Sequence, residues 1–135
     1  MKSKRRIAVS GIGAVSAFGW GTDSLRAGLI SGSTAIDATS ILDTSGHRTQ
    51  LAGEVPSAPE SVKTSIFDWD VLSRADQFAV AAANEAVNQA GLKTRGRPHG
   101  VFFGGSTAGM LEAEEWYSRL IGVCTGRPSP VSYTH

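Results

Sequence analysis

The chain has 135 residues, 41% of them hydrophobic and 19% charged, which is the composition of an ordinary globular domain with a modest core. Thirteen basic and twelve acidic side chains leave a net charge of +1, which excludes a strong overall field for holding nucleic acid or an anionic membrane. The basic cluster within residues 2–6 has no interleaved aromatic residue or base-reading motif, so we interpret it as a solvated tail.

The apolar run from Ile7 to Phe18 follows this basic start, as the apolar region of a secretory signal would. Four small residues interrupt the run: Ser10, Gly11, Gly13 and Ser16. Its β-branched residues favour a strand, and no run reaches the roughly 20 apolar residues of a membrane span. The single cysteine, Cys124, excludes an internal disulfide, so with no targeting segment we expect a cytoplasmic protein.

The first half of the chain is predicted to form a strand, a helix and a second strand. Residues 6–10 are expected to be a strand buried on both faces, which ends in a turn at residues 11–13. Thr22 is expected to cap a short helix that ends at Gly32. An excursion loop over residues 33–48 then leads to a strand over residues 50–55, which is ended by prolines.

The clearest predicted helix covers residues 72–90, with Asp70 as its cap and Gly91 as its stop. Its apolar positions recur at spacings of three and four: Leu72, Ala75, Ala79, Ala82, Ala86 and Ala90. Such a stripe of methyl groups lets a helix approach a neighbour closely, so we expect the alanine face to be buried. Phe67 and Trp69, just before this helix, are available to cover an edge of the core.

Three bulky residues, Val101 to Phe103, run into a turn of small ones, and we expect a buried strand over residues 100–105 followed by a tight loop. The apolar spacing after the loop predicts a helix over residues 110–121, with Glu112 and its acidic neighbours at the positive end of the helix dipole. Small residues at the carboxyl edge of a sheet leave room for a ligand, so this loop is the most informative place to look for function.

Strands and helices therefore alternate along the chain, and this order predicts an α/β fold with a largely parallel or mixed sheet.

Three interpretations of the sequence motifs suggest different functions. Gly11 and Gly13 resemble part of a dinucleotide-binding turn, but Ser16 stands where a third glycine or an alanine is required, and no phosphate-loop lysine follows either glycine turn. Ser106 has the local sequence of a serine hydrolase nucleophile, and a hydrolase needs an acid and then a histidine after it. The only later histidine is His135, and no acid follows Glu115.

The third reading is a resemblance. Successive landmarks look like those of the β-ketoacyl-[acyl carrier protein] synthases: residues 5–16, 43–46, 52–55, 74–78, 82–92 and 104–110. No single landmark is decisive, but their order and spacing cover nearly the whole chain.

This resemblance implies an incomplete N-terminal half of a thiolase-like layered α/β/α fold, with residues 1–135 ending before the nucleophile. It also implies decarboxylative Claisen condensation of acyl and malonyl thioesters on acyl carrier protein, in a homodimer or a ketosynthase-like heterodimer, without cofactor, metal, nucleic acid or membrane. The catalytic cysteine and both histidines of the family belong to a later part of the sequence. Cys124 lacks the small-residue elbow and the nearby cation of a reactive thiol, and His47, His99 and His135 match no catalytic position.

The same resemblance places Ser106, Thr107 and Ala108 in the wall of the acyl pocket. Thr107 matches the residue that gates this pocket, which is usually a larger aliphatic one, so the change suits a relative in polyketide or polyene synthesis. We therefore predict the N-terminal portion of a 3-oxoacyl-[acyl carrier protein] synthase that is inactive alone. A noncatalytic ketosynthase-like partner or split-enzyme subunit is the alternative, and a hydrolase that uses Ser106 is a remote one.

Overall fold

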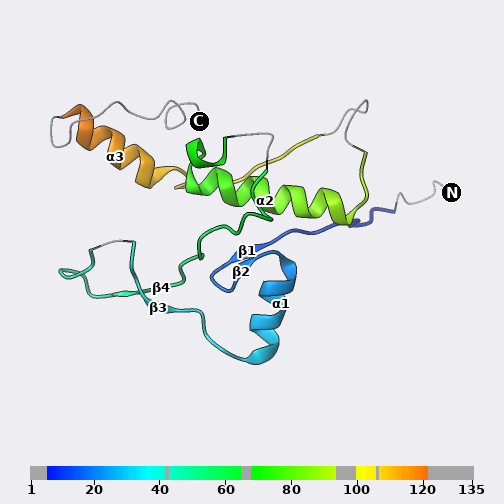
Figure 1. Ribbon diagram of the computed structural model, residues 1–135, viewed down its shortest axis with the longest axis horizontal. Helices are drawn as coiled ribbons and strands as arrows, with labels where there is room; N and C mark the ends of the chain where they lie inside the picture. The colour runs from blue at the N-terminus through cyan, green and yellow to red at the C-terminus, as the bar shows by residue number, and fades with distance from the viewer. Residues whose placement is uncertain (1–5, 42, 65–67, 94–99, 106, 122–135) are drawn as a thin grey trace.

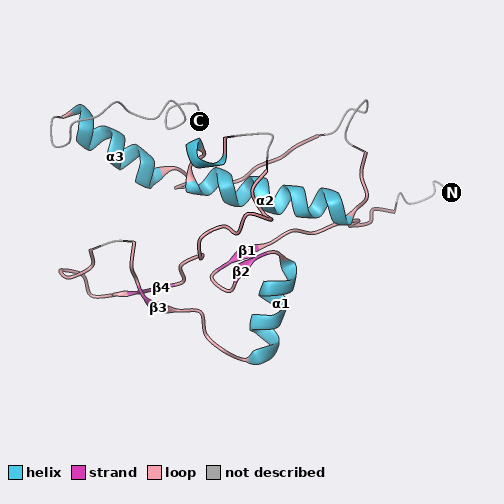
Figure 2. Ribbon diagram, viewed as in Figure 1, coloured by secondary structure: helices cyan, strands magenta, loops and turns pink. Residues whose placement is uncertain are grey.

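The longest element is α2 (Arg74–Gln89); in Figure 1, α1 and all four short strands lie on one side of it, and α3 lies beyond one of its ends. The computed structural model describes residues 6–41, 43–64, 68–93, 100–105 and 107–121. Two further α-helices are α1 (Thr22–Ser31) and α3 (Met110–Leu120), and a single 3₁₀ turn, η1 (Trp69–Val71), precedes α2. Figure 2 shows that extended chain without secondary structure connects most of these elements. Among the described residues, no helix has the length and apolar character needed to cross a membrane.

All three predicted helices are confirmed, but two of the predicted caps are wrong. Ser73, not Asp70, caps α2, because its Oγ accepts a hydrogen bond from the Asp76 amide at 3.1 Å while Asp70 lies within η1. Thr22 is the first residue of α1 rather than its cap, which is Gly21. The left-handed residue that ends α1 is Gly32, as predicted.

The predicted sheet is largely absent from the described residues, which hold two short antiparallel pairs instead of a parallel or mixed sheet. The pair of β1 (Val15–Ser16) and β2 (Gly19–Trp20) is a tight hairpin. The pair of β3 (Asp37–Ala38) and β4 (Leu51–Ala52) closes the excursion loop, so only part of the strand expected over residues 50–55 forms.

The strands expected over residues 6–10 and 100–105 are wrong for this structure. Both segments are unpaired and exposed, with 92% of Ile7 and 96% of Phe102 accessible to solvent. A strand exists only when a neighbour satisfies its backbone amides and carbonyls, and the described residues supply no such neighbour to either segment. The apolar sequence of these segments is thus extended but not buried.

Aromatic side chains from β2, η1 and α2 make the core. The Trp20 ring lies 6.0 Å from that of Trp69 and 5.5 Å from that of Phe78, between centroids. Trp69 is only 7% exposed, which confirms that it covers a core edge; Phe67 lies outside the described residues. The Arg74 guanidinium lies 5.2 Å from the Phe78 ring centroid and donates to the carbonyl of Val55. These contacts join the start of α2 to the chain that follows β4.

The alanine stripe of α2 allows a close approach, as its sequence predicts, but the neighbour is the extended segment before β1. The expected burial of the alanine face is wrong for this structure, because no residue of α2 is fully buried. A Cβ atom added at Gly13 would lie 1.9 Å from the carbonyl oxygen of Ala82, and one at Gly11 would lie 2.1 Å from that of Ala86. Only glycine fits at these two positions, because the contacts are with helix backbone. The two glycines that resemble part of a dinucleotide-binding turn therefore pack against α2 in this structure.

Candidate functional site

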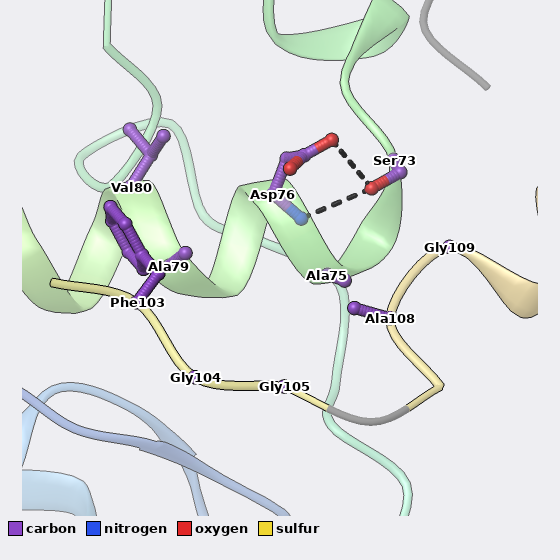
Figure 3. A pocket seen from close by; sticks show the side chains of 10 residues that line it. All are labelled: Ser73, Ala75, Asp76, Ala79, Val80, Phe103, Gly104, Gly105, Ala108 and Gly109. Atoms are coloured by element: carbon purple, nitrogen blue, oxygen red, sulfur yellow. Dashed lines mark hydrogen bonds between the residues drawn. The ribbon is translucent and has the colours of Figure 1, made fainter. Parts of the chain in front are cut away.

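A groove of about 590 Å³ lies between the first half of α2 and the glycine-rich loop before α3 (Figure 3). Its walls are mostly small or apolar: Ala75, Ala79, Val80, Phe103, Gly104, Gly105, Ala108 and Gly109, with Ser73 and Asp76 at one end. Figure 3 shows the Phe103 ring against α2 and the loop curving beneath the helix. An apolar wall with a few polar groups at one end suits a ligand that has an alkyl body and a polar head.

The loop continues directly into α3. The Met110 amide donates to the Thr107 carbonyl at 3.1 Å, and the Ala113 amide donates to the Gly109 carbonyl at 2.9 Å. Gly109 has a φ of 75°, a conformation that side-chain-bearing residues rarely adopt. The glycine-rich sequence therefore makes a hydrogen-bonded turn that aligns the loop with the helix after it.

The polar end of the groove is built at the start of α2. Ser73 is 5% exposed, and its hydroxyl donates to Asp76 Oδ2 at 2.6 Å while accepting from the Asp76 amide. The Arg74 amide donates to Glu112 Oε1 of α3 at 2.9 Å. This last bond joins the two elements that carry the opposite walls of the groove.

The three residues assigned to the acyl-pocket wall differ in where they lie. Ala108 lines the groove, whereas Thr107 is exposed and does not line it. Ser106 is outside the described residues. Their role in binding an acyl chain stays a prediction.

The other candidate side chains are outside this groove or outside the described chain. His47 is exposed on the loop between β3 and β4. His99, Cys124 and His135 fall outside the described residues, so the hydrolase reading stays a sequence-based prediction. Over the ranges that the structure describes, no three His, Cys, Asp or Glu side chains gather as a metal site.

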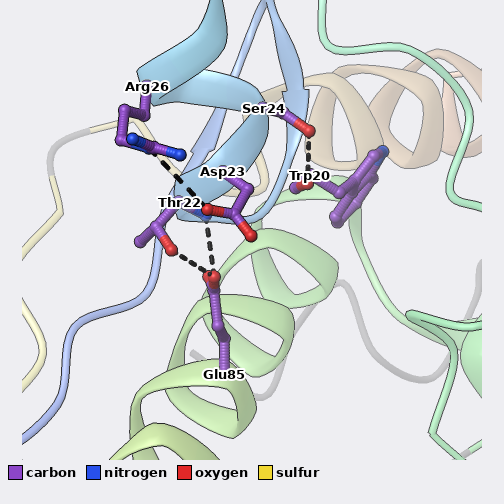
Figure 4. A network of polar contacts seen from close by, with 6 residues as sticks. All are labelled: Trp20, Thr22, Asp23, Ser24, Arg26 and Glu85. Carbon is purple, nitrogen blue, oxygen red and sulfur yellow. Dashed lines mark hydrogen bonds and ion pairs between the residues drawn. The ribbon is translucent and has the colours of Figure 1, made fainter.

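Glu85 organises a second polar cluster, which the sequence does not reveal (Figure 4). Its Oε1 accepts from the amide and the hydroxyl of Thr22, each at 2.7 Å, and its Oε2 accepts from the Ala14 amide at 2.9 Å. Desolvation raises the pKa of Glu85, but the hydrogen bonds from Thr22 and Ala14 together outweigh it, so the pKa is lowered. The ionised carboxylate thus fastens the β1 hairpin and α1 to α2. The only signal in the sequence is one acid among the alanines.

Glu54 has a similar role in the loop between β3 and β4. The Thr39 hydroxyl donates to its Oε1, and the Ser40 hydroxyl donates to its Oε2 at 2.8 Å. These hydrogen bonds lower the pKa of Glu54 to about 2; the bond from the Thr39 hydroxyl contributes most, and that from the Ser40 hydroxyl is next. Together with the amides of Ser40 and Ile41, these donors hold the start of the loop against the chain just after β4.

Comparison with known proteins assigns a class to this arrangement. Residues 4–126 match the family described as Beta-ketoacyl synthase, N-terminal domain. The match covers most of the chain, so the chain belongs to the β-ketoacyl synthase family. The resemblance read from the sequence is confirmed.

Some of the similar proteins are named as polyketide synthases, and others are named as 3-oxoacyl-[acyl-carrier-protein] synthases. The actinorhodin polyketide putative beta-ketoacyl synthase 1 of Streptomyces coelicolor is 38% identical over 89 residues, which cover 66% of this chain and 19% of the relative. The tetracenomycin polyketide synthase ketoacyl synthase alpha subunit of Streptomyces glaucescens is 32% identical over 90 residues, 67% of this chain and 21% of the relative. The 3-oxoacyl-[acyl-carrier-protein] synthase 2 of Coxiella burnetii is 28% identical over 135 residues, 96% of this chain and 31% of the relative. The chain thus spans 19% to 31% of the length of these relatives.

Proposed function

We propose that this chain is the N-terminal part of a condensing enzyme that joins acyl and malonyl thioesters of acyl carrier protein by decarboxylative Claisen condensation. The product would be a 3-oxoacyl thioester of fatty acid or polyketide biosynthesis. The observation that carries the proposal is the groove between α2 and the glycine-rich loop, because its small apolar walls fit an alkyl chain. Because the chain belongs to the β-ketoacyl synthase family, we propose that the substrate bound in this groove is an acyl chain.

Mechanistically, these residues would hold the acyl chain and leave the bond-making steps to residues elsewhere in the synthase. Transfer of the acyl group to a cysteine would release the carrier thiol, and loss of CO₂ from the malonyl group would supply a carbanion. Its attack on the new thioester would form the carbon–carbon bond and break the C–S bond, which releases the cysteine thiolate. Among the residues that the structure describes, the side chains that line the groove include no cysteine and no histidine. Its apolar wall would contribute by excluding water and by directing the acyl carbonyl toward the nucleophile.

The groove assignment is tested by filling it in the synthase polypeptide that contains these residues. Ala108→Phe places a ring in the groove and should raise the KM for octanoyl acceptors at least tenfold, with a smaller change for acetyl acceptors. Ala38→Phe is the matched control, because Ala38 is exposed in β3 and does not line the groove. Equal effects of both variants on both acceptors would refute the assignment.

We also propose that the chain forms half of a thiolase-like fold. The support is the mismatch between sequence and exposure in residues 6–10 and 100–105, since both segments are apolar and strand-forming yet uncovered. In the complete synthase these segments would pair as strands. Hydrogen exchange of both segments should therefore slow at least a hundredfold in the longer polypeptide relative to residues 1–135, and equal exchange would contradict the proposal.

The proposed alternative is a noncatalytic partner or split-enzyme subunit, which works in the cytoplasm beside a separate catalytic chain. The name of the Streptomyces glaucescens relative, a ketoacyl synthase alpha subunit, supports an assembly of separate subunits but does not bear on a noncatalytic role. Copurification of a separate ketosynthase chain, with activity only in the mixture, would favour this alternative. Activity of one continuous polypeptide would exclude it. A fluorophosphonate probe tests the remote hydrolase alternative, and we expect no labelling of Ser106.

A further inference from the structure

We infer that Glu112 is a positioning residue that sets the width of the groove by tying the glycine-rich loop to the start of α2. This inference rests on the proposed function, since it assigns the groove to an acyl chain. The Glu112 carboxylate itself does not line the groove. It acts through the backbone to which it is attached.

The first step is the bond between the two walls. Arg74 is the first residue of α2, so its amide has no acceptor within the helix. Glu112 Oε1 accepts from this amide at 2.9 Å, and the bond is partly buried. The positive end of the α2 dipole favours a carboxylate at this point. The contact is therefore charge-assisted, and such bonds are stronger than those between neutral groups.

The second step is the short and rigid path from Glu112 to the loop. Glu112 lies in the first turn of α3, three residues after Gly109, which is on the order of 5 Å along the helix axis. Two hydrogen bonds, from the amides of Met110 and Ala113 to the carbonyls of Thr107 and Gly109, make the loop and the helix continuous. Holding the Glu112 carboxylate thus holds the wall formed by Phe103, Gly104, Gly105, Ala108 and Gly109.

The third step is the polar and apolar division of the groove. The Arg74 amide is adjacent in sequence to Ser73 and Ala75, both of which line the groove. Its bond to Glu112 therefore lies next to the polar end, and the loop leads away from that end toward Phe103 and Val80. Loss of the bond would leave the loop free to move away from α2. This movement would weaken the binding of a long alkyl chain more than that of a short one, because a long chain contacts more of the loop.

Three variants and a control test this inference by hydrogen exchange on the chain. Glu112→Ala removes the acceptor, Glu112→Asp shortens the side chain with the charge retained, and Glu112→Gln keeps an acceptor at the same length. Glu114→Ala is the matched control, because Glu114 is an exposed acid in the same helix. Exchange of the Arg74 amide should accelerate roughly tenfold in Glu112→Ala and less in Glu112→Gln, since a hydrogen bond to a charged group is lost. Unchanged exchange in Glu112→Ala and Glu112→Asp would overturn the inference.

The second readout is the acyl-length profile of condensation by the synthase polypeptide. We expect Glu112→Ala and Glu112→Asp to raise the KM for octanoyl acceptors about tenfold while kcat for acetyl acceptors stays within twofold, with Glu112→Gln close to wild type. Faster Arg74 exchange with an unchanged length profile would overturn the positioning role. A wild-type polypeptide that condenses nothing would instead refute the proposed function, and the exchange result would still decide whether Glu112 holds the loop. If Glu112→Ala fails to fold, Glu112→Asp decides both readouts.

Discussion

Replacing Gly13 by alanine is the most direct perturbation of the packing between the N-terminal segment and α2. The new Cβ would lie 1.9 Å from the carbonyl oxygen of Ala82 and 2.7 Å from its carbonyl carbon. The backbone of α2 cannot rotate out of the way as a flexible side chain can. Residues 11–14 must therefore move away from α2.

Two hydrogen bonds flank Gly13 and would be lost with this movement. The Ile12 amide donates to Gln89 Oε1 at 2.7 Å, and the Ala14 amide donates to Glu85 Oε2 at 2.9 Å. Overpacking and the loss of one neutral and one charged hydrogen bond together predict a destabilisation of about 3 kcal/mol. Urea unfolding at submicromolar protein, followed by tryptophan fluorescence, measures this difference in the free energy of unfolding.

Two controls make this prediction specific. Gly46→Ala should change the free energy of unfolding by less than about 0.5 kcal/mol, because no atom of the described residues lies within 4 Å of its added Cβ. The double variant Gly13→Ala with Ala82→Gly should be no more stable than Gly13→Ala, since the clash is with the backbone of residue 82. A stable Gly13→Ala variant, or rescue by Ala82→Gly, would show that the close packing is described wrongly.

Three other predictions concern ionisation, the core and the uncovered surface. Because the pKa of Glu85 is lowered below 4.5, its carboxylate stabilises the fold above that pH and loses this effect as the pH falls through the folded-state pKa. The stability difference between wild type and Glu85→Gln should therefore shrink between pH 7 and pH 3, and a constant difference would contradict this. Trp69→Ala should cost about 3 kcal/mol in unfolding free energy, whereas Tyr117→Ala, at a side chain that is 59% exposed, should cost less than about 1 kcal/mol; equal costs would count against the core assignment. We expect the isolated chain to self-associate, and Phe102→Ser should reduce association in sedimentation, because this ring is 96% exposed; an unchanged or wholly monomeric distribution would argue otherwise.

The helices were predictable because their signals are local. The spacing of apolar residues predicts α2 and α3 within one or two residues at most ends, and Gly32 marks the end of α1. The cap of α2 could not be predicted from the sequence, since Asp70 and Ser73 are both good capping residues. Only the position of the first turn decides between them.

Strands and polar contacts were less predictable because their partners are distant in the sequence. Residues 6–10 and 100–105 have strand-forming sequences, but a ladder needs neighbours that the described chain does not place beside them. Glu85 and Thr22 are separated by 63 residues, and Glu112 and Arg74 by 38. The glycine-rich loop was identified from its own small residues, whereas the opposite wall of the groove required the structure.

The most direct measurement of the central proposal is mass spectrometry after incubation with a labelled acyl thioester of acyl carrier protein. It compares residues 1–135 with the synthase polypeptide that contains them. We predict an acyl adduct only on the longer polypeptide, at a cysteine that follows residue 135, and no adduct on Cys124 or Ser106 in either protein. Acylation of Cys124 or Ser106 with turnover would contradict the assignment of this chain as a scaffold and acyl-pocket wall.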